Sequence, residues 1–345
     1  MPSPAEQLAG KVLPDGWVVT APVKKGLLAT GGCFSQGYFV ERSGEKGFLK
    51  ALDYSAALGS PNPAVALQQM TAAFIFERDL CYRCKNSRMD RIVRATGDGK
   101  IQVDPTNTAT TVEYIIFELA EGDVRKQLDS LQTFDVALVL RALHHISTAL
   151  MQLHRGGITH RDVKPSNVLT FNNIGAKLAD LGCAGAHGIV APRDCVDVAG
   201  DCTYAPPEQF YGYNYKDPKE KGMACDVYLL GSMAAFFFTR ASMTALIEQF
   251  MDPNYVWYNW AGDFKVVLPY LNHAFSQAMT QISSHISPTP LQKEMTPIIR
   301  DLCNPDPLKR GDQKSISFGL NALSLERYVS RFNMLAERAE IGIWR

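Results

Sequence analysis

The sequence has no excess of charge, no long apolar run and few residues that suggest a metal site. Lysine plus arginine number 35 and aspartate plus glutamate number 35. A balanced charge gives no reason to expect nucleic acid or an anionic membrane surface as a partner. The longest apolar run, 233–238, is too short to span a bilayer, and no signal peptide is evident at the start. We therefore expect a cytoplasmic protein with no nucleic-acid and no membrane partner.

Cysteine is present but offers little for metal chemistry. Of the eight cysteines, only Cys81 and Cys84 have the spacing of a metal-binding pair. No second cysteine or histidine pair follows at zinc-finger distance, which disfavours a zinc site. Cys183, Cys195 and Cys202 gather in one segment, where a redox switch is the alternative to reduced, part-buried thiols.

Residue patterns divide the chain into a small strand-rich part and a larger helix-rich part. Alternating apolar residues predict strands, and Gly97-Asp98-Gly99 is typical of a hairpin turn. The strands are expected at 17–40, on both sides of a glycine-rich turn, and at 47–52, 92–95, 100–103 and 111–119. Helices are expected over 64–83 and 134–153, and a last helix carries an apolar packing stripe at Leu325, Tyr328, Phe332 and Leu335.

The same patterns set the expected domains. Residues 1–16 form an N-terminal extension, 17–120 a strand-rich lobe, and 121–345 a helical lobe that ends in a helix. The helical lobe is enlarged near 240–295, where aromatic residues gather at 255–264. Because aromatic side chains often anchor interfaces, this segment is expected either to dock a partner or to cap the lobe.

The strongest chemical signal is the stretch His160 to Asn167 (HRDVKPSN), followed by an aspartate in Asp180-Leu181-Gly182. A phosphoryl-transfer site must orient a hydroxyl group, neutralise the moving phosphate and hold magnesium. Asp162 can accept or orient the hydroxyl proton, and Lys164 can reach the transferred phosphoryl group. Asn167 and Asp180 supply the amide oxygen and the carboxylate that suit Mg²⁺.

These spacings resemble the H-R-D-x-x-x-x-N and D-F-G elements of the eukaryotic-type Ser/Thr protein kinase family, with Leu181 in place of the usual phenylalanine. The resemblance implies an α+β bilobal fold, with a small β-rich lobe that holds one main helix and a larger α-helical lobe. It also implies ATP- and Mg²⁺-dependent transfer of the γ-phosphoryl group to Ser/Thr hydroxyls of a protein substrate, with autophosphorylation.

The resemblance assigns residues of the smaller lobe to the phosphates. Lys50 resembles the catalytic strand lysine that grips the first two phosphates, and Glu77 is its expected ion-pair partner. Asp79 is the nearest competitor for that role. Two apolar neighbours and the distance to the next strand favour Glu77.

Further residues resemble those that surround the adenosine. Phe117 would stand at the back of the pocket, and the backbone of Glu118 and Ala120 would hydrogen-bond the adenine edge. Asp123 could reach the ribose, although any exposed aspartate in a turn would look the same. Leu169 is assigned to the same nucleotide site.

The phosphate loop departs from the family pattern G-x-G-x-x-G-x-V. Gly32 falls on a family glycine, whereas Thr30 and Ser35 stand at the other two glycine positions. Phe34 matches the aromatic residue at the loop tip, and Gly37 stands where valine usually covers the adenine. These small residues still allow backbone N–H groups to point at the phosphates.

A second departure is linked to the first. Phe48 occupies a position that is usually alanine, where a large ring would crowd the adenine beneath a valine. We expect a swap in which Phe48 fills the volume that Gly37 vacates. The alternative is that the loop alignment is wrong by one residue.

The segment 201–208 resembles the G-T-x-x-Y-x-A-P-E pattern. Thr203 is expected to hydrogen-bond Asp162 and Lys164 and is counted with them as catalytic. This arrangement, like the presence of Lys164, favours substrates with Ser/Thr hydroxyls.

Two downstream residues are expected to support the site. Asp226 resembles the buried helix aspartate that fixes the backbone of the catalytic loop, and Arg310 resembles the ion-pair partner of Glu208. The alternative for Arg310 is an ordinary surface arginine.

The segment from 181 to 202 contains no serine, threonine or tyrosine. In the family, a phosphate on this segment usually neutralises the arginine that precedes the catalytic aspartate, here Arg161. Asp194, Asp197 and Asp201 are available instead. We predict that a fixed carboxylate, or no partner, serves Arg161, and that activity does not await phosphorylation.

Two rival functions remain open. A small-molecule kinase of the aminoglycoside-phosphotransferase type would usually lack Lys164 and the A-P-E segment. A pseudokinase that binds partners without catalysis is supported by the altered phosphate loop, but the four residues that matter most for catalysis are intact: Lys50, Asp162, Asn167 and Asp180.

Overall fold

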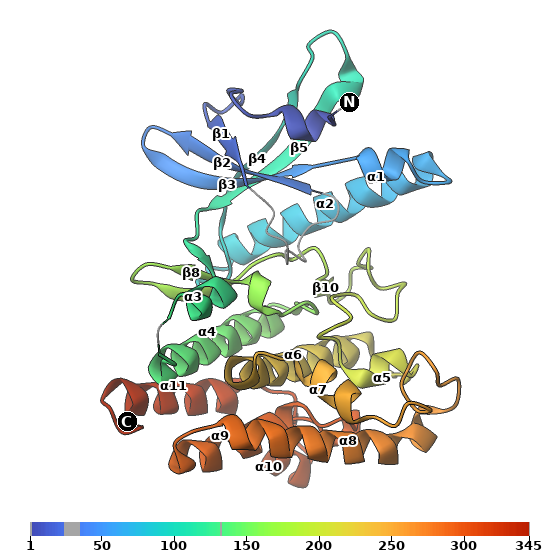
Figure 1. The fold of residues 1–345 in the computed structure, drawn as a ribbon. Coiled ribbons are helices and arrows are strands. Elements are labelled where there is room, and N and C mark those ends of the chain that lie inside the picture. Colours follow the sequence, from blue (N-terminus) through green and yellow to red (C-terminus); the bar gives the residue numbers. More distant parts are fainter. Residues whose placement is uncertain (1, 24–34, 132, 345) are drawn as a thin grey trace.

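A computed structural model describes residues 2–23, 35–131 and 133–344 of the chain. A small lobe is built on a five-stranded antiparallel sheet, and a larger lobe consists mainly of helices (Figure 1). The strands cross the sheet in the order β1-β2-β3-β5-β4. They are β1 (Val18–Pro22), β2 (Ser35–Arg42), β3 (Glu45–Leu52), β4 (Ala95–Gln102) and β5 (Thr111–Glu118). The α+β bilobal fold expected from the sequence is confirmed.

The glycines at 97 and 99 lie inside a strand, so the predicted hairpin turn at this place is wrong. β4 runs through both glycines and pairs with β5, with an irregularity between Ala95 and Gly97. A Cβ atom on Gly99 would lie 2.6 Å from the hydroxyl oxygen of Tyr114 on β5. The glycine is therefore required for the close approach of this tyrosine. The chain reverses later, around the short 3₁₀ helix η2 (Thr108–Thr110).

The main helix of the small lobe, α2 (Pro63–Asn86), covers the predicted segment and is preceded by the short α1 (Ser55–Leu58). The side chain of Asn62 caps its first turn by accepting a hydrogen bond from the N–H of Val65, and a proline stands at the first helical position. Its inward face carries Glu77, of which only 5% is exposed. A buried carboxylate needs a partner. Helix α2 itself lies between the sheet and the larger lobe (Figure 1).

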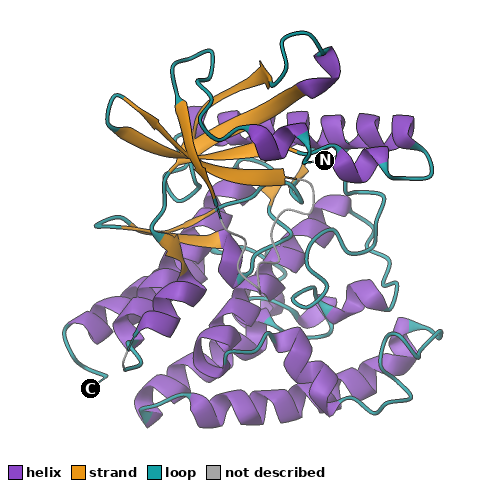
Figure 2. Cartoon of the chain, turned by 45° about the horizontal axis from the view of Figure 1, so that its top comes forward, coloured by secondary structure: helices purple, strands orange, loops and turns teal. Residues whose placement is uncertain are grey.

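The larger lobe holds a three-stranded sheet, a two-stranded sheet and most of the helices (Figure 2). Its strands are β6 (Gly122–Asp123), β7 (Ile158–Thr159), β8 (Val168–Phe171), β9 (Gly175–Leu178) and β10 (Gly185–Ala186). Its helices are α3 (Val124–Ser130), α4 (Val136–Arg155), α5 (Pro207–Phe210), α6 (Pro218–Thr239), α7 (Met243–Phe250), α8 (Phe264–His285), α9 (Thr289–Leu302), α10 (Gln313–Ser317) and α11 (Glu326–Glu340). Short 3₁₀ helices are η1 (Pro4–Gln7) in the small lobe, and η3 (Pro165–Asn167) and η4 (Pro307–Lys309) in the larger lobe.

Helices α4 and α6 form the centre of the larger lobe. By length and composition both could cross a membrane, but 56% and 89% of their most apolar windows are buried inside the protein. Their apolar character is therefore explained by core packing. Helix α11 packs along α4 (Figure 1), and its stripe of Tyr328, Phe332 and Leu335 is buried, as predicted for a packing face.

The first residues of the chain pack on the outer side of the five-stranded sheet. Ala5, Leu8 and Leu13 are buried in one cluster with Trp17 and residues of the sheet. The hydroxyl group of Tyr38 on β2 donates to the carbonyl oxygen of Ala5 at 2.7 Å. The described part of the N-terminal extension is thus part of the core of the small lobe.

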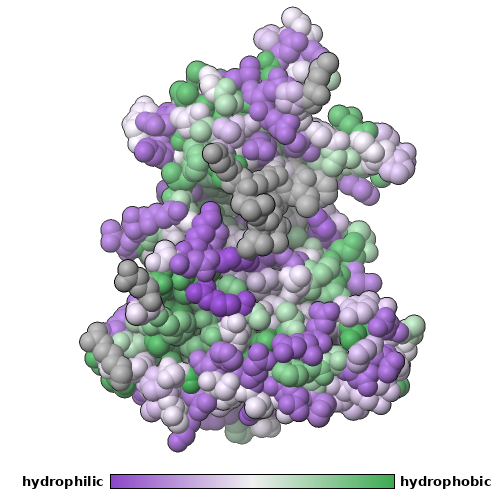
Figure 3. All heavy atoms as spheres, in the orientation of Figure 1, coloured by the Kyte–Doolittle hydropathy of each residue, from purple (hydrophilic) through white to green (hydrophobic). Residues whose placement is uncertain are grey.

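The aromatic residues of 255–264 mostly contact other aromatic residues of the chain. The rings of Tyr255 and Tyr270 stack at 3.6 Å, and those of Trp257 and Phe210 stack at 4.9 Å. Tyr258 is 67% exposed. These contacts favour the capping role over docking for all but the exposed ring. Polar and apolar residues are interspersed on the face of the molecule shown in Figure 3.

Candidate active site

The loop between β7 and β8 carries the HRD sequence, and α6 fixes its backbone. The carboxylate of Asp226 accepts hydrogen bonds from the N–H groups of His160 at 2.8 Å and Arg161 at 2.7 Å. The ring of His154, at the end of α4, lies 2.8 Å from the same carboxylate. The sequence predicted the place of Asp226 but missed His154, which looks like an ordinary basic residue in a last helical turn. Asp226 is completely buried, so these partners compensate its charge.

The carboxylate of Asp162 retains room for one further hydrogen bond. Its Oδ1 accepts from the N–H of Asp201 at 2.8 Å, and its Oδ2 accepts from Nδ2 of Asn167 at 3.0 Å. Nζ of Lys164 lies 3.1 Å from Oδ2. An ionised carboxylate has about four acceptor positions, so the three partners among the described residues leave one position on Oδ1. That position could accept the proton of an incoming hydroxyl group. Burial raises the pKa of Asp162, against the effect of Lys164.

Lys50, Glu77 and Asp180 converge from three separate elements. Nζ of Lys50 on β3 donates to both carboxylate oxygens of Glu77, at 2.7 and 2.9 Å, and to Oδ1 of Asp180 at 3.1 Å. Asp79, the competitor for this role, pairs with Arg78 at the surface. Burial alone would lower the pKa of Lys50, but the carboxylates of Asp180 and Glu77 outweigh it and raise that pKa. The ammonium group therefore stays charged where phosphate oxygens would bind.

Asn167 and Asp180 carry hard oxygen atoms on two segments that are joined by a backbone hydrogen bond. The N–H of Ala179 donates to the carbonyl oxygen of Asn167 at 2.8 Å, which ties β9 to the catalytic loop. Nδ2 of Asn167 donates to Asp162, so the amide oxygen Oδ1 of Asn167 points away from Asp162. The charge of Lys50 lowers the pKa of Asp180 to about 2, so the side chain is a carboxylate at neutral pH. This donor set fits Mg²⁺.

Gly37 and Phe48 are complementary in volume on neighbouring strands. Gly37 on β2 pairs with Lys50, and Phe48 lies two residues earlier on β3. A Cβ atom added to Gly37 would lie 2.9 Å from the ring of Phe48. The ring thus occupies the space above the glycine, as the swap predicts. Phe117 lies directly opposite Phe48 on β5 and is buried.

The segment that connects the two lobes follows directly after Phe117. The N–H of Glu118 donates to the carbonyl oxygen of Arg94 at 3.0 Å, so this N–H group is already used within the chain. Its side chain binds Lys177 at 2.7 Å. Ala120, two residues further on, packs part-buried against the hydrophobic core that contains residues of both lobes.

Asp123 and Leu169 lie opposite each other in the small sheet of the larger lobe, where β6 pairs with β8. The Oδ1 atom of Asp123 accepts from the N–H of Lys126 and so caps α3. A carboxylate has further acceptor positions, so this cap does not exclude a ribose contact. Leu169 is part-buried beside it.

Three residues assigned to the phosphate loop, Thr30, Gly32 and Phe34, lie outside the described residues. Ser35, at the start of β2, is part-buried and pairs with Leu52.

Thr203 does not make the contacts predicted for it. Its N–H and Oγ1 both donate to Oδ1 of Asp201, at 2.9 and 2.7 Å, and its side chain is exposed. Asp201 instead contacts the catalytic residues, with Oδ2 3.3 Å from Nζ of Lys164. The pattern G-T-x-x-Y contained this signal, because the position three residues before Tyr204 is Asp201. Thr203 therefore orients Asp201 and does not touch Asp162.

Arg310 and Glu208 form a buried ion pair. Nη1 and Nη2 of the arginine donate to the two carboxylate oxygens at 2.6 and 2.7 Å, and both side chains are at most 1% exposed. Tyr215 donates to the same glutamate at 2.9 Å. The expected partner of Glu208 is thus in place, and the pair anchors the end of the segment that contains Asp201.

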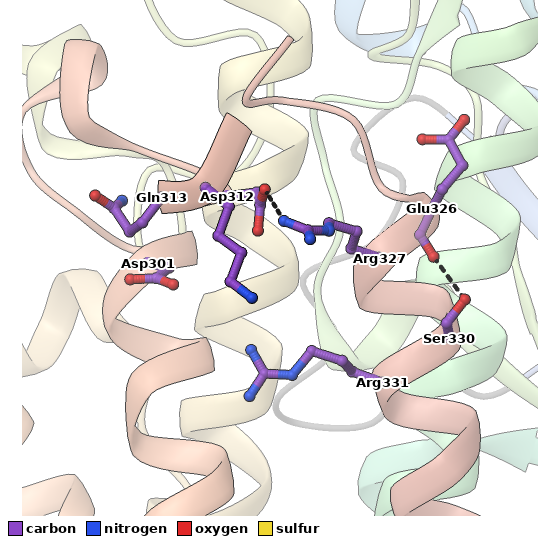
Figure 4. A pocket seen from close by; sticks show the side chains of 8 residues that line it. Asp301, Asp312, Gln313, Glu326, Arg327, Ser330 and Arg331 are labelled. Carbon is purple, nitrogen blue, oxygen red and sulfur yellow. Dashed lines mark hydrogen bonds and ion pairs between the residues drawn. The ribbon is translucent and has the colours of Figure 1, made fainter. Parts of the chain in front are cut away.

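A separate cavity of about 690 Å³ lies at the far end of the larger lobe, between α9, α10 and α11 (Figure 4). Side chains of both charge signs line it, among them Asp301, Asp312, Arg327 and Arg331. Arg327 donates to Asp312 at 2.6 Å. This cavity contains none of the residues described above.

Residues 82–317 match the model of the family described as the protein kinase domain. The chain belongs to the eukaryotic-type protein kinase family. The matched range of this kinase includes Asp162, Asn167 and Asp180, but not Lys50 and Glu77. The fold nevertheless brings these two residues to the same site. The part of the kinase before residue 82 is also where the phosphate loop departs from the family pattern.

Curated kinases from several organisms are similar to this one. The chain is 26% identical over 199 residues to the hormonally up-regulated neu tumor-associated kinase of Mus musculus. This alignment covers 57% of the present chain and 24% of the mouse protein. It is 31% identical over 122 residues to the Aurora/IPL1-related protein kinase 2 of Caenorhabditis briggsae (34% and 39% covered). It is 33% identical over 108 residues to cyclin-dependent kinase 1 of Encephalitozoon cuniculi (30% and 36% covered). The kinase thus aligns with at most 39% of the length of these relatives.

Proposed function

We propose that this chain is an ATP- and Mg²⁺-dependent protein kinase that transfers the γ-phosphoryl group to Ser/Thr hydroxyls of a protein substrate, and that it also phosphorylates itself. The observation that carries the proposal is the convergence of four side chains, Lys50, Asp162, Asn167 and Asp180, from three separate parts of the chain.

Each of these residues has a role that follows from its contacts. Lys50, held by Glu77 and Asp180, would bind phosphate oxygens of ATP with its charged ammonium group. Asn167 and Asp180 would hold Mg²⁺, which when bound neutralises phosphate charge. Asp162 would orient the substrate hydroxyl and accept its proton through the free position on Oδ1. Lys164, beside it, would stabilise the negative charge on the transferred group.

Support for a Ser/Thr hydroxyl substrate is less direct. It comes from Lys164 in the catalytic loop and from the Ser/Thr kinase named among the relatives, the probable serine/threonine-protein kinase pknA2 of Bifidobacterium longum. That protein is 26% identical over 135 residues.

The test is phosphoryl transfer from γ-labelled ATP by the purified full chain, with Mg²⁺ and with cell-extract proteins as acceptors. Wild type should label protein on serine or threonine. The Asp162→Asn variant should bind ATP and Mg²⁺ in a thermal-shift assay but transfer the phosphoryl group at least about 10³-fold more slowly than wild type. Asp180→Asn should lose the Mg²⁺-dependent part of binding as well.

Three results would contradict the proposal. Binding of ATP and Mg²⁺ by wild type without any transfer would favour the pseudokinase. Labelling of a small molecule and of no protein would favour the aminoglycoside-phosphotransferase type. Labelling confined to tyrosine would remove the Ser/Thr assignment.

A further inference from the structure

Asp201 places a second carboxylate on the lysine of the catalytic loop. Nζ of Lys164 lies 3.1 Å from Oδ2 of Asp162 on one side and 3.3 Å from Oδ2 of Asp201 on the other. The side chains of Lys164 and Asp201 are 7% and 13% exposed. A charge pair in such a position is screened little by solvent, so its geometry matters for the site.

The orientation of Asp201 is fixed by its own neighbours. Thr203 donates to Oδ1 with both its N–H and its hydroxyl group, which turns Oδ2 toward Lys164. The carbonyl oxygen of Thr203 in turn accepts from Oγ of Ser242 at 2.5 Å, at the start of α7. A chain of contacts therefore connects α7 to the catalytic loop.

The backbone beside Asp201 approaches the catalytic loop very closely. A Cβ atom on Gly200 would overlap the carbonyl oxygen of Arg161 and lie 2.7 Å from Oδ1 of Asp162. Because Gly200 has no side chain, the N–H of Asp201 can reach Oδ1 of Asp162 at 2.8 Å. Asp201 thus contacts both catalytic side chains, one through its N–H group and one through its carboxylate.

We propose that Asp201 is a positioning residue for phosphoryl transfer, which holds the ammonium group of Lys164 in place beside Asp162. A lysine side chain is flexible and loses rotamer entropy when it is held in place, so two carboxylates that fix its end preorganise it for the transition state. The family pattern G-T-x-x-Y has a threonine at the position of Asp201, so the negative charge at this position is a feature of this chain. The proposal rests on the proposed kinase function.

The same contacts keep Lys164 protonated. Burial would lower its pKa, but Asp162 and Asp201 together more than offset this effect and raise it. Two further titratable groups, Cys183 and Tyr204, are close enough for their own pKa values to respond to the charge of Lys164. Neither of them supplies a fixed negative charge at neutral pH, because burial raises the pKa of both.

The first test is Asp201→Asn, which keeps an oxygen for the two donors of Thr203 and removes the charge that faces Lys164. We expect kcat to fall about tenfold, the scale of one charge-assisted contact in a transition state. The KM for ATP should change less than about twofold, because Lys50 and Asp180 bind the nucleotide independently. Asp197→Asn makes the same change at an exposed site of the same segment and should leave kcat unaltered.

The second test is a double-mutant cycle with Lys164→Met. If Asp201 acts through Lys164, adding Asp201→Asn to Lys164→Met should lower kcat no further. Independent, multiplying losses would overturn the proposal, and so would a single Asp201→Asn variant as active as wild type. Should Asp201→Asn unfold early in a thermal melt, Asp201→Thr replaces it in the same cycle with the same two outcomes. An inactive wild type would contradict the proposed function itself, whereas an active wild type with an additive cycle contradicts only the role of Asp201.

Discussion

The guanidinium group of Arg161 is bound to the carboxylate of Asp194 at 2.6 Å. Its other nitrogens donate to the carbonyl oxygens of Cys183 at 2.8 Å and Ala184 at 2.7 Å, so its donors are used on the segment that follows Asp180. The second oxygen of Asp194 accepts from the N–H of Ala191 at 2.8 Å, which fixes the carboxylate in turn. A carboxylate of the segment itself therefore neutralises the arginine, which is one of the two alternatives predicted from the absence of hydroxyl residues in 181–202.

The first prediction concerns this pair. Asp194→Ala should lower kcat about fivefold, because a part-exposed ion pair contributes about 1 kcal/mol or less. Treatment of wild type with a phosphatase should leave kcat unchanged. Asp197→Ala, at an exposed position of the same segment, is the matched control and should behave as wild type. Mass spectrometry that finds an activity-raising phosphate on residues 181–208 would show that Asp194 does not replace one.

The second prediction tests the exchange of volume between Gly37 and Phe48. Gly37→Val should lower the affinity for ATP and the melting temperature, because its side chain would overlap the ring of Phe48 and overpacking costs about 1–3 kcal/mol. Phe48→Ala on its own should weaken ATP binding by removing an apolar contact. The double variant, which restores the usual family pair, should bind ATP more tightly than the product of the two single effects. Calorimetric titration with ATP measures all four proteins, and strictly additive effects would show that the two positions are not coupled.

The sequence was sufficient for the parts of the site that lie close together in the chain. Asp162, Lys164 and Asn167 are spaced so that one loop presents all three, and the fold keeps that spacing. The pairing of Lys50 with Glu77 was also predictable, from the family resemblance, the two apolar neighbours of Glu77 and its distance from the next strand.

The rest depended on information that local patterns do not contain. Glycine serves both turns and close contacts, so Gly97 and Gly99 predicted a hairpin turn in a segment that is a strand, where Gly99 leaves room for Tyr114. The contacts of Asp194 depend on the path of an irregular segment, which has no periodicity to reveal it. At Asp201 the pattern did contain the position, but sequence reasoning chose Thr203 because it has the expected hydroxyl group.

The third prediction concerns the buried pair of Arg310 and Glu208. Arg310→Met should lower the free energy of unfolding by about 3–5 kcal/mol, because it leaves an uncompensated carboxylate in the interior. Lys309→Met, at the neighbouring residue with a 69% exposed side chain, should change it by less than about 0.5 kcal/mol. Urea unfolding followed by circular dichroism measures both variants. Equal stability of Arg310→Met and wild type would contradict the importance assigned to the pair.

The fourth prediction is a pH dependence of stability at the cavity in Figure 4. Burial raises the pKa of Asp301 to about 6, with Arg331 acting against the shift and Asp312 adding to it. The folded state therefore holds this proton more tightly than the unfolded state does, and the contribution to stability is lost as the pH rises from about 4 to 6. Above that range, wild type carries the full cost of a part-buried charge.

Asp301→Asn should accordingly stabilise the protein at pH 7.5, by roughly 1 kcal/mol after allowance for the partial exposure of the side chain, and should give a smaller gain at pH 4.5. The Asp312→Asn variant is a control for which we expect the opposite change in stability. The hydrogen bonds from Ser315 and Arg327 outweigh burial and lower the pKa of Asp312, so its charge stabilises the fold above its unfolded pKa. That variant should be less stable than wild type at pH 7.5. Urea unfolding at the two pH values decides the matter, and a gain for Asp301→Asn that is equal at both would contradict a raised pKa at this position.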